Sequence, residues 1–126
     1  MDHNSQMNKA LQQLIQMEQQ YALERNGKLR SPYEAYAVMK EEFEELLEHT
    51  EEVHVVHEAY WKALRKRDEQ AVLDTLAQTL QDDALYVARA ALKLIAVANL
   101  ALECESTQSR KSENTTTNGG NNNDVR

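Results

Sequence analysis

The chain has 126 residues, a length that suits a single domain, and a formal net charge of −7 at pH 7. This charge argues against nucleic-acid binding, which needs a basic face to displace counterions from phosphates. Glycine (three) and proline (one) are scarce and the single cysteine permits no internal disulfide, so the composition predicts an all-α protein of the cytosol.

A first helix is expected over residues 5–25. Ser5 or Asn4 can cap its start, and Gly27 is a suitable stop because glycine tolerates the left-handed conformation after a helix. The first residues, MDHNSQMNK, lack the apolar core of a secretory signal, which again favours the cytosol. One apolar stripe recurs at helical spacing: Met7, Leu11, Leu14, Ile15 and Tyr21.

The segment Ser31-Pro32-Tyr33-Glu34 is a capping box, with serine as cap, proline at the first helical position and glutamate reaching back. It predicts a long second helix over about residues 32–66, either continuous or broken near His49-Thr50. Its apolar stripe, at alternating steps of three and four, consists of Tyr36, Met39, Phe43, Leu46, Thr50, Val53, Tyr60 and Leu64.

A short helix capped by Asp68 is expected over residues 68–81, and a last helix, starting at Asp82-Asp83, over residues 82–103. The last helix is apolar on almost every side, which predicts a central position. Its two mid-span cations, Arg89 and Lys93, argue against a membrane-spanning segment. Small residues on one face would let another helix approach closely: Ala84, Ala88, Ala91 and Ala98.

We therefore expect the helices over about 32–66 and 82–103 to pack antiparallel, with the first helix beside them. The last helix carries more apolar surface than the first helix can cover, so we expect at least a homodimer. Residues 104–126 are almost devoid of apolar side chains and rich in Asn, Thr and Ser. They are predicted to form a disordered tail after a helical domain over residues 1–103.

Residues 40–47, KEEFEELL, hold the first candidate site. Glu42 and Glu45 lie one helical turn apart, so their carboxylates can point at a common place. Two readings stay open: a solvated helix face, or half of a site for Mg²⁺, which takes one or two carboxylates together with substrate phosphates. No glycine-rich phosphate loop is present, since three glycines can hardly build one.

Asp82 and Asp83 give the second candidate: they either cap the last helix or donate a carboxylate to the same metal. Tyr86, Arg89 and Lys93 continue a polar stripe from them. It is either a solvent-facing edge or a surface on which a tyrosine stacks on a base and two cations hold phosphates.

His54 and His57 do not form the HExxH zinc motif, and we expect His57, on the extension of the apolar stripe, to be packed or hydrogen-bonded. Residues 31–50, SPYEAYAVMKEEFEELLEHT, resemble the first metal-binding helix of the MazG-like, all-α nucleoside triphosphate pyrophosphohydrolases. The similarity is greatest to small phage and prophage members. It extends in composition over residues 8–103, with Trp61 followed by an alanine-rich last helix.

The resemblance implies cleavage of a nucleoside triphosphate to monophosphate and pyrophosphate, with Mg²⁺ or Mn²⁺ as cofactor. The family's E-x-x-E pair falls on Glu42 and Glu45, and the first acid of its E-x-x-D pair falls on Asp83. Tyr86 stands where that pair has its aspartate. By this resemblance, Glu42, Glu45 and Asp83 would hold the metal and Glu41 would orient or deprotonate the water. The substrate would meet Tyr86, Arg89 and Lys93.

Two hypotheses follow. The first is a metal-dependent nucleoside triphosphate pyrophosphohydrolase of the bacterial or phage-infected cytosol, which the Glu41-Glu42-x-x-Glu45 set favours. The second is a catalytically inactive helical scaffold or protein-interaction module, which the missing aspartate favours. Neither hypothesis involves a nucleic acid or a membrane.

Overall fold

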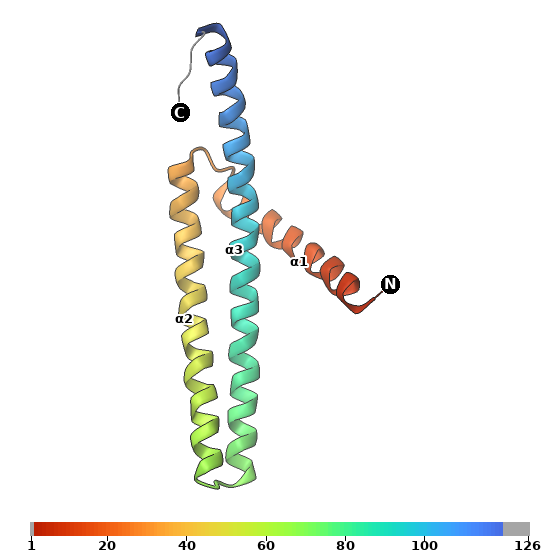
Figure 1. The fold of residues 1–126 in the computed structure, drawn as a ribbon, viewed down its shortest axis with the longest axis vertical. Coiled ribbons are helices and arrows are strands. Elements are labelled where there is room, and N and C mark those ends of the chain that lie inside the picture. Colours follow the sequence, from red (N-terminus) through yellow and green to blue (C-terminus); the bar gives the residue numbers. More distant parts are fainter. Residues whose placement is uncertain (1, 120–126) are drawn as a thin grey trace. The chain divides into compact units, whose positions relative to one another are not determined.

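The computed structural model describes the backbone of residues 2–119 and the side chains of residues 2–104. It contains three α-helices: α1 (His3–Asn26), α2 (Pro32–Arg65) and α3 (Gln70–Gly119) (Figure 1). The described residues contain no strand, which confirms the predicted all-α class. The described residues divide into two compact units, residues 2–39 with 95–119, and residues 40–94.

α1 begins at His3, two residues earlier than predicted, because Asp2, and not Asn4 or Ser5, is its cap. The Ser5 backbone N–H donates a 2.7 Å hydrogen bond to Asp2 Oδ1. This bond lowers the pKa of the Asp2 carboxyl, so its contribution to stability is present above the ordinary carboxyl pKa and is lost as the pH falls through the lowered one. At the other end Gly27, at φ 73°, donates to the Leu23 carbonyl at 2.8 Å, which confirms the predicted stop.

The first unit is built around small residues. Its buried cluster consists of Ala22, Leu29, Ala35, Leu100, Ala101 and Cys104. Asn99 Nδ2 of α3 also donates to Gln19 Oε1 of α1 at 3.2 Å. The predicted apolar stripe of α1 is largely exposed: Ile15 is buried, whereas Met7, Leu11, Leu14 and Tyr21 are not.

The capping box at the start of α2 is confirmed, with one change of partner. The Glu34 backbone N–H donates to Ser31 Oγ at 3.1 Å, as predicted. The Glu34 carboxylate reaches back one residue further than the motif requires and accepts from the Arg30 backbone N–H at 2.8 Å. α2 then runs unbroken through His49-Thr50, where Thr50 Oγ1 donates back to the Leu46 carbonyl at 2.8 Å.

A four-residue turn, 66–69, joins α2 to α3. The Asp68 N–H donates to the Ala63 carbonyl at 3.0 Å and the Arg67 N–H to the Leu64 carbonyl at 3.1 Å, which is the Schellman pattern. Arg67 occupies its left-handed position, at φ 60°, where glycine is the usual residue. The side chain at this position therefore strains the turn.

We expect Arg67→Gly to raise the free energy of unfolding by about 0.5–1 kcal/mol. Relief of the left-handed strain of about 1–2 kcal/mol exceeds the extra chain entropy of a glycine. Urea denaturation measures the change. Lys66→Gly is the matched control, because Lys66 does not have a positive φ, and it should be neutral or destabilising. A loss of stability in Arg67→Gly would contradict the strain.

The predicted boundaries of α3 were wrong at two places. The expected helices over 68–81 and 82–103 form one continuous helix, so Asp82 and Asp83 lie in its interior and cap nothing. The helix also passes the expected end near residue 103 and is described as far as Gly119, in line with the absence of glycine and proline from residues 104–118. Residues 120–126 of the expected tail lie outside the described residues, and disorder of the segment stays a prediction.

Candidate functional site

The unit of residues 40–94 is an antiparallel helical hairpin, in which the parts of α2 and α3 run side by side (Figure 1). In each helix one set of the residues shielded from solvent recurs at alternating steps of three and four, the spacing of a coiled coil. We call these residues the inner seam. They are Glu42, Leu46, His49, Val53, Val56, Tyr60 and Ala63 of α2, and Leu73, Leu76, Leu80, Asp83, Val87, Ala90 and Leu94 of α3.

The inner seam differs from the stripe predicted for α2. Leu46, Val53 and Tyr60 belong to both, but Phe43 and Leu64 are exposed. α2 carries two neighbouring apolar rows, the inner seam and the exposed row that contains Phe43 and Leu64. The predicted stripe takes residues from both rows. The row that faces α3 starts at a glutamate, Glu42, which is only 7% exposed.

Polar contacts cluster on one side of the seam. Glu45 Oε1 lies 3.8 Å from Lys93 Nζ across the hairpin. Tyr86 stacks on His49 with ring centroids 5.4 Å apart and planes at 17°, and the Arg89 guanidinium lies 5.3 Å from the Tyr86 ring centroid. This side, which we call the charged flank, therefore joins α2 to α3 by one ion pair and one ring stack, and the Arg89–Tyr86 contact lies within α3.

A groove of about 220 Å³ opens on the charged flank between these side chains. Four of the seven predicted site residues line it: Glu45, Tyr86, Arg89 and Lys93. His49, which the sequence analysis did not select, also lines it. The four-and-three spacing from Glu42 through Leu46 to His49 was the signal that could have found it. We call this space the Tyr86 groove.

Asp83 lies elsewhere. It lines a neighbouring groove of about 510 Å³ with His49, Val55, Val56 and Tyr86. On α3 it precedes Lys93, the partner of Glu45, by ten residues, which is about 15 Å along the helix. Ligands of one Mg²⁺ must each reach about 2.1 Å from the ion. Glu45 and Asp83 are therefore too far apart along the hairpin to share it.

The predicted metal set does not fit a site with three carboxylates. Among the described residues, no group of three His, Cys, Asp or Glu side chains could hold a metal ion. Glu42 lies in the inner seam, Glu45 faces an ammonium group, and Glu41 is exposed next to them. The chemistry that these residues offer together is anion recognition by Arg89 and Lys93 beside an aromatic ring.

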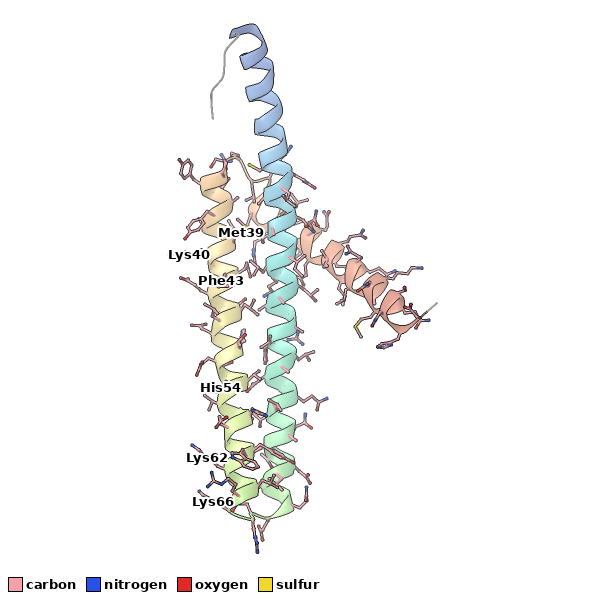
Figure 2. The ribbon with its side chains drawn as sticks, in the orientation of Figure 1. Met39, Lys40, Phe43, His54, Lys62 and Lys66 are labelled. Carbon is pink, nitrogen blue, oxygen red and sulfur yellow. The ribbon has the colours of Figure 1, made fainter. Side chains whose placement is uncertain are left out.

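The side of the hairpin opposite the charged flank carries several large apolar side chains, with polar residues between them. Glu45 and Lys93 each precede a seam residue by one position, and they lie on the charged flank. The residues that follow each seam residue by one position therefore lie on the opposite side of the hairpin. On α2 they are Phe43, Leu47, Thr50, His54, His57, Trp61 and Leu64; on α3 they are Asp74, Ala77, Gln81, Ala84, Ala88 and Ala91. Figure 2 labels Phe43 and His54 of this apolar flank.

The apolar flank is exposed over its largest side chains. Leu47 and Trp61 each expose 52% of their surface, and Phe43 and Leu64 nearly as much. By length and composition, α3 over Gln70–Cys104 could also cross a membrane, a test that the core helix of a soluble protein can pass too.

Comparisons with protein-family models, with curated proteins and with solved structures found no match. The resemblance to the pyrophosphohydrolases therefore rests on residues 31–50 and on composition, and the function is inferred from the two flanks of the hairpin.

Proposed function

We propose that the protein is a helical interaction module that docks to another protein surface through the apolar flank. The observation that carries this proposal is the exposure of Phe43, Leu47, Trp61 and Leu64 on one side of the hairpin. Large apolar side chains gathered on one exposed face are typical of an interface, and aromatic residues are enriched in interface cores. A two-helix hairpin can bury only its seam, so this second face needs a partner.

The arrangement of the carboxylates also supports a module without a metal centre. Asp83 is a seam residue about 15 Å from the level of Glu45 and Lys93. The Glu45 carboxylate lies beside the ammonium group of Lys93, which offsets its negative charge without a metal ion. A seam position explains Asp83 as well, since a polar residue among apolar ones fixes the register of a coiled coil at some cost in stability.

The second candidate is the nucleoside triphosphate pyrophosphohydrolase implied by the resemblance. The observation that favours it is the Tyr86 groove, which gathers an aromatic ring, a guanidinium and an ammonium. In this candidate Arg89 and Lys93 would bind phosphate oxygens, and Tyr86 would contact the base. Glu41, exposed on the charged flank, would accept the proton of the attacking water.

An assay of pyrophosphate release separates the two candidates. The protein is incubated with each nucleoside triphosphate and with Mg²⁺ or Mn²⁺, and Glu45→Gln and Glu44→Gln are assayed beside it. Glu44 is the matched control because it is exposed and lies 3.9 Å from Lys40 on its own helix. The interaction module predicts no release in any of the three proteins. Metal-dependent release that Glu45→Gln abolishes and Glu44→Gln retains would overturn it in favour of the enzyme.

A further inference from the structure

We infer that the partner of the apolar flank is a second copy of this chain. The inference rests on the proposed function, because it names the surface that the interaction module docks to. The flank consists of two unlike rows. The α2 row carries the large side chains Phe43, Leu47, Trp61 and Leu64, and the α3 row is lined by four alanines, Ala77, Ala84, Ala88 and Ala91.

These rows are complementary to each other, which is what an interface between identical copies requires. Two hairpins can meet face to face by a twofold rotation about an axis along the hairpin. The large row of each copy then lies over the alanine row of the other. A twofold axis across the hairpin would instead set large row against large row and leave the alanine rows facing each other, with a gap between the helices.

The arrangement with the axis along the hairpin makes a four-helix bundle in which α2 of each copy packs on α3 of the other. These helices run antiparallel, as do α2 and α3 within a chain. Every neighbouring pair in the bundle therefore has opposed helix dipoles, which is the favourable orientation. The alanines allow the close approach that such packing needs.

The size and charge of the apolar flank suit this partner. A stretch of 25 residues, such as 70–94, is about 37 Å long and two packed helices are about 20 Å wide, so the face covers roughly 700 Å². This is close to the contribution of about 800 Å² per partner in a standard interface. Each chain carries a net charge of −7, yet the only acidic side chain of the flank is Asp74, so two copies can meet there without bringing their carboxylates together.

Cross-linking between different chains tests the arrangement. Glu45 and Lys93 lie at the same height, so His54, nine residues on in α2, and Ala84, nine residues back in α3, also do. A rotation about an axis along the hairpin leaves the position of each residue along that axis unchanged. His54 of one copy therefore lies over Ala84 of the other. One chain carries His54→Cys, the other Ala84→Cys, and both carry Cys104→Ala. Both positions are exposed, so the substitutions leave the seam intact.

We expect the oxidised mixture to contain roughly ten-fold more disulfide-linked dimer than either chain alone, because only the mixed pair brings two Cα atoms within disulfide reach. Each chain has one cysteine, so every disulfide joins two copies. The matched control replaces Ala84→Cys with Asp82→Cys, two residues away on the charged flank, and should give no cross-link above that of the single chains.

Two results would overturn the inference. A dominant cross-link in the His54→Cys chain alone would mean that α2 packs on α2. The absence of cross-links from all samples would mean that the flank does not bind a second copy. If pyrophosphate release is also absent, the interaction module stands with a different protein as partner. Metal-dependent release together with the mixed cross-link would overturn the proposed function and leave the dimer in place.

Discussion

Leu100→Ala is expected to lower the free energy of unfolding by about 2–5 kcal/mol, the range for removing a buried leucine side chain. Leu100 is 5% exposed and is the largest residue of α3 in the buried cluster of the first unit. Most of its neighbours there are small: Ala22, Ala35 and Ala101. Alanine side chains cannot rotate into the cavity that the substitution leaves, so we expect a loss in the upper half of this range.

The control is Leu102→Ala, two residues further along the same helix. Leu102 is 61% exposed, so the same substitution should change the free energy of unfolding by less than about 0.5 kcal/mol. Urea denaturation followed by circular dichroism measures both variants. Equal losses at the two positions would contradict the packing of the first unit.

Asp83→Leu is expected to raise the free energy of unfolding by about 1.5–3 kcal/mol, the gain from burying a leucine side chain. Asp83 interrupts the seam of α3 between Leu80 and Val87, and it lies beside Val56 of α2. A leucine there would continue the apolar contact across the hairpin and remove a half-buried carboxylate.

Asp82→Leu is the matched control, since Asp82 is exposed on the same helix and its carboxylate accepts from Gln78 Nε2 at 3.4 Å. It should leave the stability within about 0.5 kcal/mol of the parent. Thermal unfolding with and without Mg²⁺ gives both values. A destabilised Asp83→Leu variant that has also lost a Mg²⁺-dependent rise in melting temperature would support the metal reading of Asp83.

Local signals in the sequence predicted the end of α1 and the start of α2. The capping box at Ser31-Glu34 and the stop at Gly27 each depend on a few neighbouring residues, so they could be read without knowing the fold. Asp82-Asp83 misled the prediction because the same two residues that can cap a helix can also stand inside one. Asp82 does so on an exposed face, where water solvates it.

Within the candidate site, the sequence predicted correctly only the grouping of residues that lie on the same helix. Tyr86, Arg89 and Lys93 follow each other at steps of three and four, so α3 alone places them on one face and in the Tyr86 groove. Whether Asp83 reaches Glu45 depends on the register between two helices, which the turn at 66–69 sets. Two adjacent apolar rows on α2 also left open which row faces α3, and this choice decides where Glu42 lies.

The central claim is that two copies of this chain dock through the apolar flank, and not through the charged flank. Sedimentation velocity at tens of micromolar protein tests it on the parent, Leu47→Glu and Val55→Glu. Leu47 and Val55 are both on α2 and expose 52% and 57% of their surface, but Leu47 lies on the apolar flank and Val55 lines a groove of the charged flank. We predict a dimer for the parent and Val55→Glu and a monomer for Leu47→Glu, because the new carboxylate would be buried unpaired in the interface. A monomeric parent, or equal behaviour of the two variants, would contradict the claim.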